Sequence, residues 1–263
     1  MNVLIKTIFI SCILSNTVSK PKINKVERTN NTIVNFFINK ELSIRNYQIV
    51  GVFDYIPVQP FKKDIKSIKT SSHLKDRYSE ETSFLYENNN LTNISYAVDR
   101  DNTLNFITFR YHLNYSSKNK LETIYIKDRL IFYFDYNSTG QLKLIKLFFK
   151  DGMTKIYNIS YKQERINFSV DVIKKGEIYL DANDKDYLLL NKDKKLVDYN
   201  FTGINSYYNI KYSKDGNIKN FSYDKTNSSN NNAEFIYTKF DKEDNWLERT
   251  LQKYKTTRII NYK

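Results

Sequence analysis

Apolar and polar residues alternate along much of the chain after residue 90. In INFSVDV, which spans residues 166–172, and in YNIKY, residues 208–212, every second residue is apolar or aromatic. A period of two places alternate side chains on opposite faces of a β-strand. No long window shows the three- and four-residue spacing that an amphipathic helix requires. The pattern predicts an all-β fold, an antiparallel meander of β-hairpins that forms a long curved sheet or an open barrel.

The region before residue 89 has a weaker pattern. We predict an N-terminal β portion with a long polar loop for residues 20–88, and a region of repeated hairpins for residues 89–263. TIVNFFI and NYQIVGVFDYIPV, within residues 31–58, have the composition of strands. The following polar segment, FKKDIKSIKTSSHLKDRYSEETSFLYENNN, has mixed charge and no sustained period. It predicts a long loop with one short helix near residues 72–81.

A seven-residue pattern recurs six times. An apolar or aromatic residue comes first and Asp, Asn or Ser second, and the seventh residue is aliphatic or Trp. The six segments are VDRDNTL from Val98, YSSKNKL from Tyr115, YNSTGQL from Tyr136, LNKDKKL from Leu190, YSKDGNI from Tyr212 and FDKEDNW from Phe240. Side chains at the second position can accept a backbone hydrogen bond at the start of a type I turn.

The fifth position of this pattern is Gly, Asn or Asp in five segments, and Lys194 is the exception. These residues adopt positive φ most easily. A type I turn followed by such a residue closes many β-hairpins, so each segment is predicted to join two strands. Shorter turns are predicted at FKDGM, residues 149–153, and IKKGE, residues 173–177. Asp215 and Gly216 thereby become turn residues and not candidates for chemistry.

The segments YNSTGQL and YSKDGNI resemble the tyrosine–aspartate (YD) repeats of Rhs-type proteins, whose core is Tyr-Asp-x-x-Gly-Asn-Leu. FDKEDNWLERT is similar to a variant core ending in Gly-Asn-Trp, found in small exported bacterial proteins. The resemblance covers residues 91–263 and implies a β-hairpin array. In long members such arrays wrap into a shell around a toxin or bind carbohydrate. This chain has too few repeats to enclose another domain, so the resemblance does not imply the shell function.

Composition supports a folded β protein. The chain has 22 Tyr and 17 Phe, and Tyr suits a half-buried sheet face that touches water. Hydrophobic residues make up 40% of the chain, which argues against disorder of the whole. The net charge is +13, but the basic residues are spread along the chain. That distribution favours a solvated, lysine-rich sheet over a specific nucleic-acid site.

The first residues predict export. Lys6 precedes an apolar run and then small polar residues, which is the pattern of a signal peptide over residues 1–19. The run is too short to span a bilayer as a helix. Cys12, the single cysteine, follows a loose lipoprotein box and would anchor the chain at a membrane if lipidated. Plain secretion is favoured because the apolar run before Cys12 is very short, and the mature chain would then have no thiol.

No catalytic or metal-binding residue is predicted, and no cofactor. His73 and His112 are far apart, without HxH or HExxH spacing, and the chain lacks GxSxG, GxGxxG and GxxxxGK. Trp246, the single tryptophan, is interpreted as a core residue, with stacking on a sugar ring as the alternative. A pair of carboxylates that converge only in the folded protein would leave no sequence signature.

The sequence is compatible with three hypotheses for function. The favoured one is a non-enzymatic secreted or envelope-associated protein that binds a glycan or protein partner across its Tyr-rich sheet, with a continuous exposed aromatic strip. The second is a basic sheet that binds an acidic polysaccharide or nucleic acid, with lysines gathered on one face. The third is a hydrolase with two carboxylates about 5–10 Å apart in a cleft.

Overall fold

The chain folds as one large antiparallel sheet around a helix. A computed structural model describes residues 24–46, 65–74, 78–88, 90–99, 107–181, 186–201, 207–213, 217–225, 228–251 and 254–263. Helix α1 spans Lys25–Asn46. The strands are β1 Ile65–Leu74, β2 Tyr78–Glu87, β3 Asn90–Asp99, β4 Ile107–Tyr115, β5 Leu121–Ile126, β6 Arg129–Tyr136, β7 Leu142–Phe148, β8 Thr154–Lys162, β9 Arg165–Lys174, β10 Glu177–Asp181, β11 Tyr187–Leu190, β12 Leu196–Asn200, β13 Tyr207–Tyr212, β14 Ile218–Lys225, β15 Ser228–Phe240, β16 Trp246–Leu251 and β17 Tyr254–Tyr262. The predicted all-β meander is confirmed.

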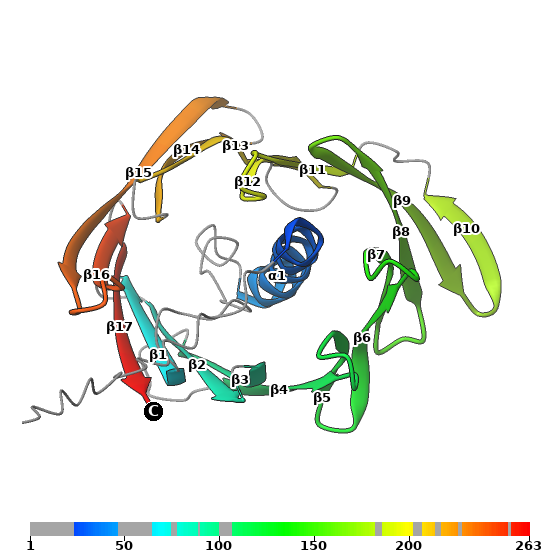
Figure 1. Ribbon diagram of the computed structural model, residues 1–263, viewed down its shortest axis with the longest axis horizontal. Helices are drawn as coiled ribbons and strands as arrows, with labels where there is room; N and C mark the ends of the chain where they lie inside the picture. Colours follow the sequence, from blue (N-terminus) through cyan, green and yellow to red (C-terminus); the bar gives the residue numbers. More distant parts are fainter. Residues whose placement is uncertain are drawn as a thin grey trace, which may run out of the picture.

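The sheet is nearly closed into a barrel (Figure 1). Successive strands pair antiparallel, and β1 pairs with β17 from Ile65–Tyr262 to Leu74–Tyr254. Strand β10 projects from this ring, because β9 pairs with β11 through one half and with β10 through the other. Within the described residues, β12 and β13 share the single pair Tyr199–Tyr207, which makes this the narrowest seam.

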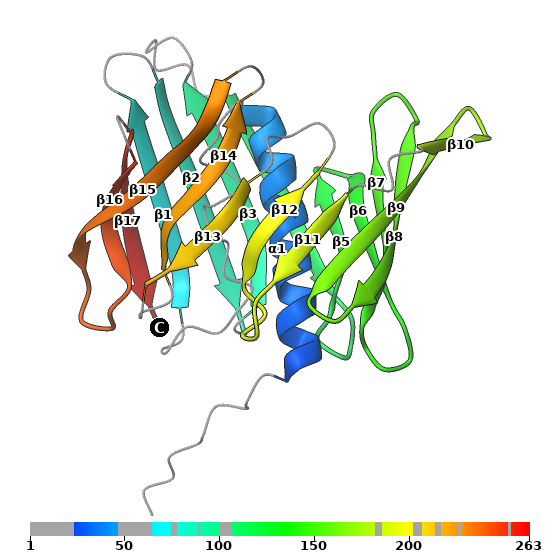
Figure 2. The same ribbon diagram turned by 90° about the horizontal axis from the view of Figure 1, so that it is seen from above.

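Helix α1 runs through the lumen of the barrel, as both ribbon views show (Figures 1 and 2). Its residues 33–40 are all buried. The prediction of a strand at TIVNFFI was therefore wrong. Ile33, Val34, Phe36 and Phe37 suit strands as well as helices, and a helix buried on every side has no continuous polar face to reveal its period. Most of the second predicted strand, NYQIVGVFDYIPV, lies outside the described residues.

The predicted polar loop was also wrong, since β1 and β2 occupy most of its length. On β1 the lumen side carries Thr70 and Ser72, both buried, where an apolar residue would normally alternate. This removes the period-two signal from the sequence. The predicted boundary at residues 88 and 89 falls between β2 and β3, which pair with each other from Ser79–Asp99 to Glu87–Asn90.

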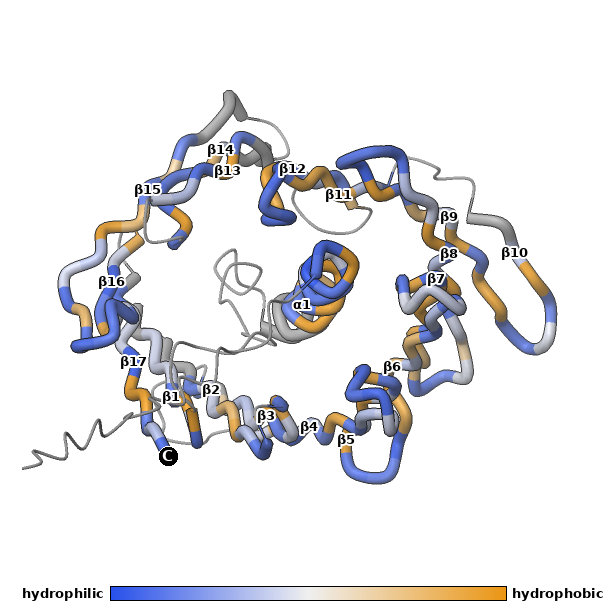
Figure 3. The backbone as a smooth tube through the Cα atoms, viewed as in Figure 1, coloured by the Kyte–Doolittle hydropathy of each residue, from blue (hydrophilic) through white to orange (hydrophobic). Residues whose placement is uncertain are grey.

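The remaining strands follow the predicted alternation. Ile166, Phe168 and Val170 on β9 are buried in the core, and hydrophobic and hydrophilic residues alternate along many strands of the ring (Figure 3). The outer face carries charge pairs between neighbouring strands. Lys69 lies 2.9 Å from Glu81, and Lys143 lies 2.9 Å from Asp135. Exposed pairs of this kind each contribute less than about 1 kcal/mol, so the apolar lumen provides most of the stability.

The recurring segments close hairpins as predicted. Asn137 N–H donates to Gln141 O and Gly140 N–H donates to Asn137 O, both at 2.9 Å, and Gly140 has a φ of +82°. The weakest match, Lys194, also adopts positive φ, at +63°. Turns of matching register lie at YSSKNKL, LNKDKKL and FDKEDNW, and the two shorter predicted turns are present. Residues 100–104 and 214–216, the centres of VDRDNTL and YSKDGNI, lie outside the described residues.

The second position of the turn has the predicted role. In the segment from Leu190, the Asn191 Oδ1 accepts the backbone N–H groups of Asp193 at 2.9 Å and Lys195 at 3.0 Å. Asp241 accepts two N–H groups in the same way in the last segment. These bonds satisfy backbone donors at the turn and fix its shape.

Candidate functional site

Tyrosine hydroxyls connect each hairpin to the one before it. Each of five half-buried tyrosines at a strand end donates to a backbone carbonyl at the start of an earlier strand. The bonds are Tyr115 to Leu91 at 2.9 Å, Tyr136 to Leu121 at 2.8 Å, Tyr161 to Leu142 at 2.5 Å, Tyr212 to Leu196 at 2.6 Å and Tyr237 to Ile218 at 2.8 Å. Burial raises the pKa of Tyr115, Tyr136 and Tyr161. These hydroxyls therefore remain protonated donors, and the tyrosines serve the wall itself.

The first turns of α1 dock on two of the recurring turns. The Asn30 Nδ2 donates to Gly140 O at 2.8 Å, and its Oδ1 accepts the Leu142 N–H at 2.9 Å. One buried amide thus satisfies both a donor and an acceptor of the backbone. Thr32 Oγ1 donates to Lys194 O at 2.7 Å. These bonds fix the depth of α1 in the barrel.

Deeper in the lumen, α1 packs against four large aromatic residues, which we call the helix-facing wall: Tyr157, Phe168, Tyr199 and Phe201. The Phe36 ring centroid lies 5.0 Å from that of Tyr199, and the Phe37 centroid lies 4.9 Å from that of Tyr157. Both pairs are edge-to-face, a favourable geometry for aromatic rings.

A buried lysine of α1 also contacts the helix-facing wall. The Lys40 Nζ lies 4.4 Å from the Phe201 centroid and donates to the Tyr157 hydroxyl at 3.3 Å. A cation over an aromatic face inside the protein is stabilised by the ring quadrupole. The helix is therefore held by polar as well as apolar contacts.

On β1, β16 and β17, across the ring from the helix-facing wall, the buried side chains are largely polar. Here the lumen side carries a second set, which we call the polar wall: Thr70, Ser72, Trp246, Arg249, Thr256 and Arg258, all buried. The guanidinium carbons of Arg249 and Arg258 lie 4.4 and 3.6 Å from the Trp246 ring centroid. Trp246 is only 4% exposed. The prediction that Trp246 is a core residue is confirmed, and its ring is not on the surface for a sugar.

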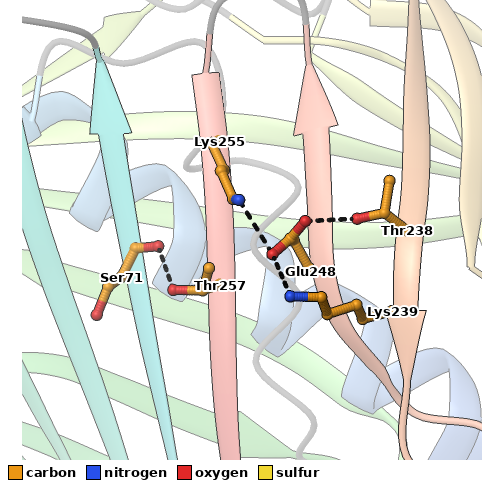
Figure 4. Close-up of polar contacts among 6 residues, drawn as sticks. All are labelled: Ser71, Thr238, Lys239, Glu248, Lys255 and Thr257. Carbon is orange, nitrogen blue, oxygen red and sulfur yellow. Dashed lines mark hydrogen bonds and ion pairs between the residues drawn. The ribbon is translucent and has the colours of Figure 1, made fainter.

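Outside the polar wall, a carboxylate joins three strands on the outer face (Figure 4). The Glu248 carboxylate accepts Thr238 Oγ1 at 2.8 Å and lies 3.1 Å from Lys255 Nζ and 3.2 Å from Lys239 Nζ. The hydrogen bond from Thr238, followed by those from Lys255 and Lys239, lowers the pKa of Glu248 to about 2. The group is a cross-strand support and not a proton donor near neutral pH.

A pocket of about 230 Å³ opens at the end of the barrel where α1 begins. It lies among the start of the helix, the turn before β7, the β8–β9 turn and the turn after β11. Its lining residues are Lys25, Val26, Thr29, Gln141, Tyr161, Gln163, Glu164, Ile166, Leu190 and Lys194. Ile166 and Leu190 form a buried floor, and the polar groups lie above it. No sequence pattern indicated this site, because its lining residues come from four separate segments.

The residues singled out from the sequence are not brought together. His73 is on β1 and His112 is on β4, where its side chain is exposed. Within the described residues, no group of three or more His, Cys, Asp or Glu side chains could hold a metal ion. Cys12, the rest of the predicted signal peptide, Asp215 and Gly216 lie outside the described residues. None of the helices in the described part is long and apolar enough to cross a bilayer.

The outer face has no continuous aromatic strip within the described residues. Its exposed aromatic side chains, Tyr133, Tyr179 and Phe240, are on β6, β10 and β15. Lysines occur round the ring on β1, β7, β8, β14, β15 and β17, at Lys69, Lys143, Lys155, Lys219, Lys239 and Lys255. The pocket contains one carboxylate, that of Glu164. The described lysines thus lie on several strands round the ring and do not form a single basic face.

No family model matches the sequence, and no curated protein matches it. Among solved structures, a porin-like protein from Bacteroides uniformis aligns with 77% of this chain and 100% of its own, at 11% identity and a TM-score of 0.35. A chain of the TcdB2–TccC3–Cdc42 complex aligns with 65% of this chain at 14% identity and a TM-score of 0.24, and the match spans 11% of that chain.

Proposed function

We propose that this protein is a non-enzymatic, exported structural module in which the hairpin array forms a shell around the N-terminal helix of the same chain. One observation carries the proposal: residues 33–40 of α1 are buried on every side within the barrel. A shell of this kind protects an apolar segment that would otherwise be exposed to water.

The resemblance to YD repeats belongs to this proposal. It is supported by the shared turn geometry and by the tyrosine hydroxyls that join successive hairpins. The array is too short to enclose a domain, so the resemblance alone does not imply a shell. A single helix needs far less room than a domain, and the strands of the described sheet surround it (Figure 1).

The proposed location is outside the cytoplasm, with a glycan or protein of the cell envelope as partner. Helix α1 begins with Lys25 at one end of the barrel (Figure 2), and residues 1–24 come before it in the sequence. The predicted signal peptide and Cys12 belong to that part of the chain. Lipidation of Cys12 would hold this end of the barrel at a membrane. The proposal does not include binding across a Tyr-rich outer face, because Tyr133 and Tyr179 are the only exposed tyrosines among the described side chains.

Hydrogen–deuterium exchange of the full chain, followed by mass spectrometry, tests the enclosure of α1. We expect peptides that cover residues 33–40 to exchange as slowly as those from β8 and β9, because the helix opens only when the shell opens. Strand β10, which projects from the ring, is the internal control and should exchange quickly. Fast exchange of residues 33–40 in the folded protein would show that the helix is not enclosed and would overturn the proposal.

Fractionation of a bacterial host that expresses the full chain tests the export part. Wild type and Cys12→Ser are compared in the medium, the soluble extract and the membrane fraction. Export predicts that both chains leave the cytoplasm, and only loss of membrane association in Cys12→Ser supports a lipid anchor. Retention of both in the cytoplasm would contradict the proposed location.

A further inference from the structure

The pocket at the start of α1 has a chemistry that the proposed shell does not require. Its side chains offer two ammonium groups, Lys25 and Lys194, one carboxylate, Glu164, and two amides, Gln141 and Gln163. Within the described residues, no hydrogen bond or ion pair of these five side-chain ends is present, although the backbone groups of several are bonded. Five polar groups therefore converge on one concave site with their bonding capacity unused by the fold.

The size of the pocket limits its occupant. Its volume of about 230 Å³ is below the range of about 300–1,000 Å³ that holds drug-sized ligands. A single small unit fits such a space, whereas an oligomer would extend beyond it. The floor of Ile166 and Leu190 and the ring of Tyr161 give apolar surface on which one face of a small ring can rest.

The charged side chains of the pocket indicate which chemical groups the bound unit should carry. Two lysines from separate segments, Lys25 on the helix and Lys194 on the turn after β11, line the same pocket, and two ammonium groups at one pocket favour an anionic occupant. Neutral hydroxyls suit the amides of Gln141 and Gln163 and the carboxylate of Glu164, which together supply donors and acceptors. We propose that this pocket binds one unit of a sugar acid, with its carboxylate between Lys25 and Lys194 and its hydroxyls at the amides and Glu164.

The proposal goes beyond the shell function and does not depend on it. A pocket that binds a sugar acid is compatible with a barrel in any compartment. Conversely, a barrel that encloses its helix could have an empty pocket. Binding and hydrogen exchange are therefore separate measurements, and the failure of one leaves the other standing.

Isothermal titration calorimetry of the full folded chain with D-galacturonate tests the proposal, and D-galactose is the matched neutral sugar. We expect millimolar affinity for galacturonate and at least about tenfold weaker binding of galactose, because a hydrogen bond to a charged group is among the stronger ones. Lys194→Gln should weaken galacturonate binding about tenfold. Lys192→Gln, in the same turn but outside the pocket lining, should not change it.

Three outcomes would overturn the proposal. They are no heat of binding with galacturonate at about 10 mM, equal affinity for galactose, and equal weakening by Lys194→Gln and Lys192→Gln. The last result would mean attraction to the basic surface as a whole. If Lys194→Gln melts early, Lys25→Gln replaces it, because Lys25 is exposed at the helix start.

Discussion

Two sides of the barrel interior have different side chains on the same antiparallel backbone: one side is aromatic and the other is largely polar. The helix-facing wall presents aromatic rings to α1, whereas the polar wall presents two arginines, a tryptophan and three hydroxyls. Both walls consist of antiparallel strands whose alternate side chains point inward. The alternation of a strand determines which residues face the lumen. The group that packs against them there, such as helix α1, determines whether those residues are aromatic or polar. Four predictions test this contrast, from the largest expected effect to the smallest.

The first prediction concerns the apolar contact between α1 and the helix-facing wall. Phe37→Ala removes a ring that contacts Tyr157, Phe168 and Phe201. The free energy of unfolding should fall by about 3–5 kcal/mol, the usual cost of removing a buried Phe. Denaturant unfolding of the purified chain measures it. Phe240→Ala, at a ring that is 46% exposed, is the matched control and should cost less than about 1 kcal/mol.

The second prediction concerns the polar attachment of α1. Asn30→Ala leaves the carbonyl of Gly140 and the N–H of Leu142 without the amide that now bonds them. Loss of stability should be about 1–3 kcal/mol, the cost of leaving buried backbone groups unsatisfied. Asn31→Ala, one residue on in the same helix, is the control and should change stability by less than about 0.5 kcal/mol. Equal effects in the two variants would show that α1 is not fixed to the turn before β7.

The third prediction moves to the polar wall. Arg258→Met retains a long apolar side chain but removes the guanidinium that lies over Trp246. The free energy of unfolding should fall by about 1–2 kcal/mol, in the range of a desolvated cation–π contact. Arg110→Met on the exposed face of β4 controls for the loss of charge. A gain in stability in Arg258→Met would mean that the polar wall tolerates an apolar interior as well as the helix-facing wall does.

The fourth and smallest prediction concerns the outer side of the polar wall. The pKa of Glu248 lies at about 2, below its ordinary value of 4.5, so its ionised form is favoured by folding. The stability from this group is fully present above pH 4.5 and is lost as the pH falls from 4.5 towards 2. Glu248→Gln should therefore lower stability at pH 6 and narrow its gap to wild type at pH 2–3. Thermal melts across this range measure the difference, and Glu234→Gln, at an exposed site on β15, should show no such trend.

The difference between apolar and polar parts of the interior also explains which elements could be predicted from the sequence. Strands β4–β9 enclose an apolar lumen, so their alternation and their turns were visible. Strand β1 faces inward with Thr70 and Ser72, so its sequence lacks a sustained apolar period and predicts a loop. The sequence of helix α1 predicts a strand, because Ile33, Phe36 and Phe37 suit strands and a helix buried on every side has no polar face to reveal its period. Its burial depends on contacts with residues as distant in the sequence as Phe201, which no local pattern encodes.

The pocket at the start of α1 could not be predicted from the sequence for a related reason. Lys25, Glu164 and Lys194 are separated by more than 25 residues each and acquire a common location only through the register of the barrel. The turn residues, by contrast, were predicted well, because a turn is decided within five residues. Even Lys194 took the positive φ that its position in the pattern required, although its side chain does not favour it.

The pairing of β1 with β17 determines when the barrel can close, because β17 is the last described strand to be synthesised. A ribosome adds residues at about 5–20 per second, so roughly 10–40 s separate the synthesis of Asn46, at the end of α1, from that of Tyr262, at the end of β17. During that interval the ring that encloses the helix does not exist. Contacts between such distant parts of a chain also form slowly. Phe36 and Phe37 lack part of their aromatic surroundings until Phe201 has been added, and the ring around them closes only when β17 pairs with β1.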